Sequence, residues 1–333
     1  MSHLLRGGKL SFAVIIPTRN RPEELEVAVN SVVRQSLAPD EVIVVDDGSD
    51  SENLDKLRRL VSAFGAPVRL LELPCIKIGH GPAYSRNAGV EISNSSHICF
   101  LDDDDYWTDM NYISYLDETV KFEKINFDLH FCNQRAFDGG IEITRSIWIG
   151  ELSEIVKNRP RELGGEYIVS IDDILRCTGF CHLNTTCVRK EFFQSVGGFS
   201  DEIRYESDRD FFLRAIDKAK VIKYTPKSIA RHNIPDKVLA TSVSTSISKY
   251  NRWLFQLKIL ERLSIEAQHP EIQAYARKHK SYTLKKIAKT LYDEGKYDRA
   301  WVHARTALLT GFSTRWAIFT MISMGAALLQ IIF

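Results

Sequence analysis

The sequence predicts an α/β fold, in which a mostly parallel sheet is flanked by helices and followed by an all-helical extension. Two observations support this fold class. Between residues 12 and 101, four short apolar runs alternate with three segments of helical periodicity, a pattern that favours a parallel sheet with helices on both faces. After about residue 246 every segment has helical periodicity. A chain of 333 residues can hold one large α/β domain and such an extension.

Four strands are predicted in this region, and the first is a short continuous apolar run that ends at Pro17, as expected for a buried parallel strand. These strands are residues 12–16, 41–45, 68–73 and 97–101. The helices predicted between them carry apolar residues at helical spacing, and Pro22 suits the first turn of the first helix. The helices are residues 23–35, 53–64 and 81–92.

The segment after Trp107 has a mixed pattern. Its predicted strands are 127–133, 182–189 and 221–224, its helices 191–196 and 207–219, and residues 139–165 are irregular with an edge hairpin. We therefore predict an α/β domain over 1–240, a helical extension over 246–315 and an apolar helix over 316–333. Within the extension, residues 284–311 resemble one tetratricopeptide hairpin that turns at Glu294-Gly295. One such unit cannot bury its own face.

Charge and hydropathy are unevenly distributed. The formal net charge of +1 gives no sign of a nucleic-acid partner, but residues 249–315 hold 14 Lys and Arg against 6 Asp and Glu. Residues 316–333 carry no charge and lie at the short limit for spanning a bilayer. They could span it, lie in its interface or pack on the protein. Because the basic stretch favours anionic lipid, we expect membrane contact at the cytoplasmic face. No signal peptide is recognised at the start.

The six cysteines do not suggest a disulfide framework in a chain this long. Cys177, Cys181, His182 and Cys187 lie close in sequence, but they lack paired C-x-x-C spacing, so zinc is not expected. Reduced cysteines in a cytoplasmic compartment are the simpler interpretation.

Four consecutive aspartates, Asp102 to Asp105, follow the apolar run 97–101. Adjacent like charges repel and lose hydration on burial. Mg²⁺ and Mn²⁺ prefer carboxylate oxygens and often bind together with substrate phosphates. The alternative is a solvated turn in which Asp105 caps a helix starting near Trp107. The run alone does not decide between a metal–diphosphate site and a turn.

Polar residues also follow the first two strands, at 17–20 and at Asp46-Asp47. In open parallel sheets, ligands bind beyond the carboxyl ends of the strands. Three polar segments that converge on one edge favour a nucleotide and metal site.

With these residues in view, the chain resembles a family 2 glycosyltransferase of the GT-A fold, of the bacterial cell-surface glycan type. Four signatures, spread over residues 11 to 235, carry the resemblance. They are 14–22 (VIIPTRNRP), 35–36 with 41–49 (QS, EVIVVDDGS), 85–89 with 100–107 (SRNAG, FLDDDDYW), and 196–199 with 206–210 and 213–214 (VGGF, ESDRD, LR).

The resemblance implies an inverting transfer of sugar from a nucleoside diphosphate sugar, with a UDP-sugar expected. The acceptor would be a hydroxyl of a glycan or lipid-linked molecule in cell-envelope polysaccharide synthesis, and the cation Mn²⁺ or Mg²⁺. Asp47 would bind the nucleotide base, in a pocket lined by Pro17, Thr18 and Arg19. The family often has Tyr where this chain has Arg19, which puts stacking on the base in doubt.

The resemblance also implies roles around the phosphates. Arg86 would face the diphosphate, since a guanidinium fits phosphate in bidentate fashion. Its alternative is a salt bridge on a helix surface. Asp104 would bind the metal, and Asp102 or Asp103 the ribose, with the assignment open by one position.

Asp208 aligns with the family's catalytic base, although Ser207 replaces the first residue of the usual Glu-Asp pair. Glu206 or Asp210 is an alternative base. These carboxylates could also only stabilise the first turn of a helix. His232 matches a histidine that relatives place near the metal, and its alternative is a loop histidine.

Two other functions remain open. The first is a sugar-nucleotide-binding scaffold without turnover. The second is a nucleotidyltransferase, a class that favours a Gly-rich basic loop after the first strand. Residues 17–20 contain no glycine.

Overall fold

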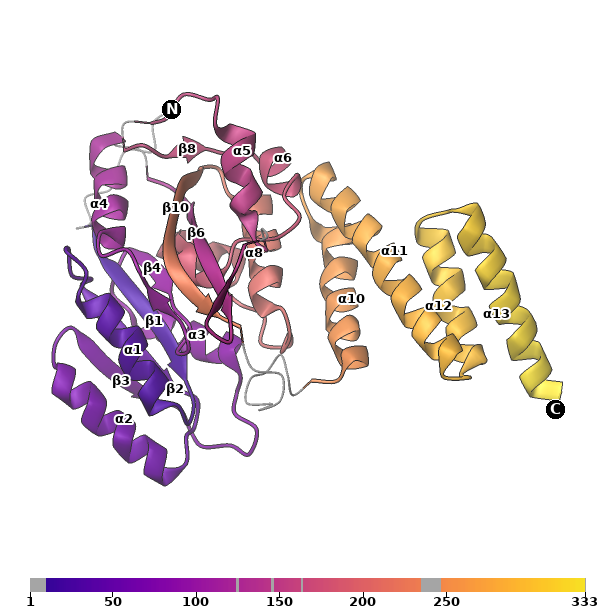
Figure 1. Ribbon diagram of the computed structural model, residues 1–333, viewed down its shortest axis with the longest axis horizontal. Helices are drawn as coiled ribbons and strands as arrows, with labels where there is room; N and C mark the ends of the chain where they lie inside the picture. The colour runs from indigo at the N-terminus through magenta and orange to yellow at the C-terminus, as the bar shows by residue number, and fades with distance from the viewer. Residues whose placement is uncertain (1–9, 124–125, 145–146, 163, 235–246, 333) are drawn as a thin grey trace. The chain divides into compact units, whose positions relative to one another are not determined.

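The computed structural model describes residues 10–123, 126–144, 147–162, 164–234 and 247–332. The chain divides into two compact units, residues 1–242 and 243–333 (Figure 1). The predicted boundary at 240–246 lies outside the described residues, as does the start of the chain.

The first unit is built on a ten-stranded sheet of order β3-β2-β1-β4-β9-β6-β10-β5, with β7 beside β6 and β8 beside β10. The four strands predicted from apolar runs are present and mutually parallel, and they agree with the predicted α/β fold. They are β1 (Phe12–Thr18), β2 (Glu41–Asp46), β3 (Val68–Glu72) and β4 (His97–Phe100). Strands β1 and β4 are buried along their whole length, which explains why they read as continuous apolar runs.

The connecting helices also match their predictions. They are α1 (Pro22–Val33), α2 (Ser51–Phe64) and α3 (Pro82–Ile92). The α2 helix begins where the Asp50 side chain accepts a hydrogen bond from the Asn53 backbone N–H. A Cβ on Gly89 of α3 would lie 2.6 Å from Cγ2 of Ile15. Glycine therefore allows α3 to lie close against β1, and this brings the start of α3 to the carboxyl edge of the sheet.

The rest of this unit extends the sheet with antiparallel pairs on both sides of β9. Its strands are β5 (Tyr106–Trp107), β6 (Leu129–Asp138), β7 (Ile141–Ile143), β8 (Tyr167–Ile168), β9 (Thr186–Arg189) and β10 (Ile222–Asn233). Its helices are α4 (Tyr112–Glu123), α5 (Leu152–Val156), α6 (Ile171–Leu175), α7 (Lys190–Val196) and α8 (Ser207–Lys218), with 3₁₀ turns at Ile149–Glu151 and Leu183–Thr185. The predicted edge hairpin is β6–β7.

Several boundaries differ from prediction. Strand β10 has 12 residues rather than the four predicted, since it pairs with β6 across two register shifts and contacts β5 and β8. Its sequence is polar and contains Pro226, so no apolar run marks it. The helix predicted near Trp107 is wrong: Trp107 lies in β5, and α4 begins at Tyr112. The strand predicted from 182 begins at Thr186, after the 3₁₀ turn.

The described part of the second unit is helical, as predicted. It contains α10 (Lys249–Glu266), α11 (Pro270–Asp293), α12 (Tyr297–Thr310) and α13 (Thr314–Ile332). The hairpin predicted over 284–311 is the end of α11 with α12, and its core is Ile287, Leu291 and Ala300. The Trp316 indole N–H of α13 donates to the Ala304 carbonyl of α12 at 3.0 Å. Within the described ranges, no helix combines the length and apolar character needed to cross a bilayer.

Candidate active site

The acidic run leaves the sheet at the end of β4 and leads into β5. Because β5 pairs with β10 through Tyr106 and Arg231, the end of β10 lies against the aspartates. Asp105 is 1% exposed and does not cap a helix, so that prediction is wrong. A carboxylate that is buried loses its hydration, so it needs hydrogen-bond donors or a cation as partners.

Asp105 has three hydrogen-bond donors from distant segments. Its Oδ2 accepts from Asn184 Nδ2 at 2.6 Å and from His232 Nδ1 at 2.7 Å. Its Oδ1 accepts from the Asn233 backbone N–H at 2.7 Å. Asp105 therefore fixes the orientation of the end of β10 and of the His232 ring.

Asp105, His182 and His232 form a cluster in which one potential ligand atom of each lies within 4.8 Å of the others. His232 donates from Nδ1 to Asp105, which leaves Nε2 as a potential ligand oriented by a carboxylate. Burial lowers the pKa of His232, but Asp105 outweighs it and holds the pKa above its usual value. Burial lowers the pKa of His182 to about 4, so this ring is neutral at pH 7.

The two histidines are not equivalent as ligands. His182 Nδ1 accepts from the Asn184 backbone N–H at 3.3 Å. A neutral ring that accepts at Nδ1 carries its proton on Nε2, and this nitrogen lies 3.9 Å from Asp102 Oδ2. His182 must therefore shift its proton before Nε2 can bind an ion, whereas Nε2 of neutral His232 can bind one directly.

Asp104, predicted as a metal ligand, is not part of this cluster. Its Oδ2 lies 3.0 Å from Arg21 NH1, which also contacts Asp103 Oδ1 at 3.1 Å. Burial and the neighbouring carboxylates raise the pKa of Asp104 to about 7, and burial raises that of Asp103 to about 6. Mutual repulsion of this kind would be relieved by a divalent cation, so the residues fit such an ion.

Arg86 comes from α3 and contacts the first aspartate. It is 6% exposed, so the alternative of a surface salt bridge does not apply. Its NH2 donates to Asp102 Oδ1, its guanidinium lies 5.6 Å from the Phe199 ring centroid, and its Nε has no partner. Burial raises the pKa of Asp102, but Arg86 and His182 outweigh it and hold the pKa below its usual value.

Asp47 and the segment before α3 form a second part of the site. The Asp47 carboxylate accepts hydrogen bonds from the backbone N–H groups of His80 (2.8 Å) and Gly81 (2.9 Å). The His80 ring stacks on Tyr84. A Cβ on Gly79 would lie 2.6 Å from Asp47 Oδ2 and 2.7 Å from Arg19 NH1. Glycine at 79 thus lets this segment approach both residues.

The other predicted base-pocket residues lie at the end of β1. Arg19 NH2 donates to the carbonyls of Ile76 and Lys77. Thr18 Oγ1 donates to Asp103 Oδ2 at 2.8 Å, and Pro17 is buried beside Val45. Thr18 thereby links the base-pocket segment to the acidic run.

Asp208 lies in the first turn of α8 and is partly exposed. Removal of solvent by the surrounding protein raises its pKa to about 6, against the opposing effect of Arg86. The two alternative bases are placed differently. Asp210 is fully buried and contacts Arg214 at 2.9 Å, and Glu206 contacts Arg209 at 3.3 Å. Asp208 combines partial exposure with a pKa raised toward neutrality.

Comparison with known sequences agrees with this geometry. Residues 13–148 match the profile described as Glycosyl transferase family 2. This match places residues 13–148, about two fifths of the chain, in that family.

Curated relatives are also glycosyltransferases by name. The chain is 27% identical over 214 residues to an uncharacterized glycosyltransferase of Haemophilus influenzae, covering 64% of each protein. It is 25% identical over 206 residues to the amylovoran biosynthesis glycosyltransferase AmsB of Erwinia amylovora, covering 62% of this chain and 64% of the relative. The matches therefore span just under two thirds of these relatives' length.

A solved structure with a similar fold is residues 1–349 of TarS from S. aureus, in complex with UDP-GlcNAc. The TM-score is 0.64 at 16% identity, over 92% of this chain and 83% of that one. The chain thus has the GT-A fold that the sequence resemblance implied.

Sequence reasoning missed four residues of the site: Arg21, His80, His182 and Asn184. Arg21 lies inside a matching signature but was given no role. In the sequence, His182 is noticeable only because cysteines lie beside it. All six cysteines are free, and among the described residues the candidate ion cluster contains none of them. Asn184 carries no charge and no motif, so only its contacts identify it.

Proposed function

We propose that this chain is an inverting glycosyltransferase that moves a sugar from a nucleoside diphosphate sugar to a hydroxyl of a glycan or lipid-linked acceptor in cell-envelope polysaccharide synthesis. The observation that carries the proposal is the convergence of Asp47, Arg86, the Asp105–His182–His232 cluster and Asp208 on one edge of the sheet. The family match over residues 13–148 and the names of the relatives support it.

The donor, which we propose to be a UDP-sugar, would bind along this edge. Asp47 would accept a hydrogen bond from the base, with Pro17, Thr18 and Arg19 beside it. Asp102 or Asp103 would bind the ribose hydroxyls. Arg86 has a buried Nε without a partner, and its planar donors suit the diphosphate.

A divalent cation would be held by His232, with Asp104 as the predicted carboxylate ligand and Asp105 and His182 beside it. When bound, such an ion neutralises charge on a leaving diphosphate. Imidazole and carboxylate together suit Mn²⁺ better than Mg²⁺, which prefers oxygen ligands alone. We therefore propose that Mn²⁺ supports higher activity than Mg²⁺.

Asp208 would act as the catalytic base. It takes the proton of the acceptor hydroxyl while the acceptor oxygen bonds to the anomeric carbon and the bond from that carbon to the diphosphate oxygen breaks. Arg86 stabilises the charge that develops on the nucleoside diphosphate. A single displacement inverts the anomeric centre and needs no covalent sugar intermediate.

The identity of the nucleotide product tests the proposal. Purified protein is incubated with a panel of sugar nucleotides and Mn²⁺, and we expect slow release of free nucleoside diphosphate by donor hydrolysis. Pyrophosphate as the product would instead show a nucleotidyltransferase. Binding without any turnover, in the presence of candidate acceptors, would favour a scaffold subunit.

The pKa of Asp208 gives a pH prediction. A base must be deprotonated, so with a pKa of about 6 kcat is expected to be constant above pH 7 and to fall about tenfold per pH unit well below pH 6. The measurement is kcat against pH at saturating donor and Mn²⁺. A flat profile between pH 5 and 8 would contradict the assignment.

We further propose that α13 contacts the cytoplasmic face of the membrane. One face of this helix exposes apolar side chains at helical spacing: Ile318, Met321, Ile322, Leu328, Leu329 and Ile332. The net charge of +8 over residues 249–315 complements anionic lipid.

Vesicles of stated composition test this contact. The protein is expected to sediment with vesicles that contain anionic phosphatidylglycerol, less so at high salt. The double variant Ile322→Asp/Leu329→Asp should remain in the supernatant. Ile141→Asp, at an exposed position of β7, is the matched control, and equal sedimentation of all three proteins would exclude the contact.

A further inference from the structure

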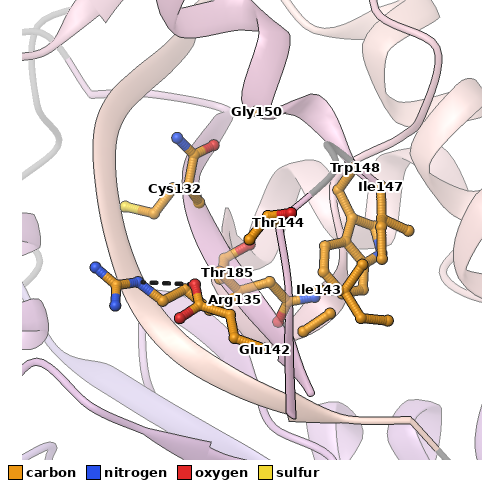
Figure 2. Close-up of a pocket in the computed structure, with 12 residues that line it drawn as sticks. Cys132, Arg135, Glu142, Ile143, Thr144, Ile147, Trp148, Gly150 and Thr185 are labelled. Atoms are coloured by element: carbon orange, nitrogen blue, oxygen red, sulfur yellow. Dashed lines mark ion pairs between the residues drawn. The ribbon is translucent and has the colours of Figure 1, made fainter. Parts of the chain in front are cut away.

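A cavity of about 250 Å³ lies beside the candidate site and has no role in the function proposed above. Residues of β6 and β7 form its walls together with Thr144, Ile147, Trp148, Gly150 and Thr185 (Figure 2). Its lining includes Gln134, Arg135, Glu142, Thr144 and Trp148. None of the residues assigned to the base, ribose or diphosphate contributes to it.

Trp148 connects the cavity to the Asp105–His182–His232 cluster. Its ring centroid lies 5.7 Å from that of His182 and 5.2 Å from that of His232, both edge-on. Ala136 of β6, which also lines the cavity, is paired with His232 of β10. A group in the cavity is therefore separated from the cluster by a single side chain.

Gln134 presents a hydrogen-bond donor with no partner. Asn184 Oδ1 accepts from the Asp102 backbone N–H at 3.0 Å, so the Asn184 amide nitrogen is the atom that faces Gln134. It donates to Gln134 Oε1 at 3.2 Å. This assignment leaves Gln134 Nε2 as a donor, and it is buried without a hydrogen bond. Buried donors of this kind normally have a partner.

The cavity wall carries one positively and one negatively charged side chain, which form an ion pair. Arg135 Nε lies 3.8 Å from Glu142 Oε1, an ion pair visible in Figure 2. Thr144 adds a hydroxyl and Trp148 an amphipathic ring. The balanced charge favours a neutral ligand rather than a phosphate, and the volume, below the ~300–1,000 Å³ of typical ligand sites, suits a single ring.

We propose that this cavity binds one neutral, hydroxyl-rich sugar ring, with Gln134 Nε2 donating to a ring hydroxyl and Trp148 as the apolar wall. The inference rests on the proposed function. The ring belongs either to the donor, as the sugar being transferred, or to the acceptor.

Two nearly isosteric variants test the cavity. Gln134→Glu keeps an oxygen that accepts from Asn184 but removes the unpaired donor, and Thr144→Val removes a hydroxyl without added charge. Ile141→Ala is the control, because Ile141 is exposed and does not line the cavity. Calorimetry measures binding of UDP and of a panel of UDP-sugars with Mn²⁺. Saturation-transfer NMR measures binding of methyl glycosides to the UDP-loaded protein.

If the ring is the donor's, both variants bind UDP like wild type but bind the preferred UDP-sugar about tenfold more weakly. If the ring is the acceptor's, both variants bind UDP and the UDP-sugar like wild type, and their methyl glycoside signal is lost. Variants that match wild type in every arm would overturn the inference. Failure of the wild-type protein to bind any nucleotide would count against the proposed function. Binding of methyl glycosides, measured without UDP, would still test whether the cavity holds a sugar ring.

Discussion

Replacement of Asp208 by Asn is expected to lower sugar transfer by about 10²–10⁴-fold, the usual contribution of a general base. The amide has nearly the same shape but cannot take a proton, so binding of nucleotide should be unchanged. Turnover with donor and acceptor, together with UDP affinity, gives the measurement. The corresponding loss of transition-state stabilisation is about 3–5 kcal/mol.

Two control variants separate catalysis from helix stability. Asp172→Asn removes an exposed carboxylate from the first turn of α6 and should leave turnover unchanged. Glu206→Gln tests the neighbouring alternative base. Near-normal turnover by a folded Asp208→Asn protein, with loss in Glu206→Gln, would move the base to Glu206.

Replacement of His232 by Ala is expected to have the second large effect, a loss of Mn²⁺ affinity of at least about 100-fold. Removal of a ligand should exceed the 10–100-fold typical of residues that only support one. Mn²⁺ binding followed by electron paramagnetic resonance measures it. His182→Ala should cost less, because His182 accepts a hydrogen bond at Nδ1 and is a poorer ligand.

Variants of the aspartates test which carboxylate supports cation binding. Asp104→Ala should weaken Mn²⁺ binding if Asp104 is a ligand, and Asp105→Ala should weaken it by releasing His232 from its orientation. His269→Ala, an exposed histidine of the second unit, is the control. Unaltered Mn²⁺ affinity in His232→Ala would exclude the cluster as the cation site.

Fold prediction succeeded where the signal was local. Strands β1, β2 and β4 are mostly apolar because they are buried, whereas the edge strand β3 is only partly buried. Helices α1 to α3 begin at proline or at a capping aspartate. The prediction found only the first residues of β10, because the rest of this strand is polar and contains Pro226. Those later residues pair with β6 across two register shifts, and such long-range pairing leaves no local apolar signature.

The acidic run shows the same division within the site. The positions of the aspartates after a buried strand, and an order of motifs that resembles one enzyme family, are patterns along the chain and can be read from it directly. The contacts of each aspartate become known only from the fold: Asp102 pairs with Arg86, Asp103 and Asp104 share Arg21, and Asp105 contacts His232. These contacts depend on the pairing of β5 with β10, which brings residues 127 positions apart within hydrogen-bonding distance.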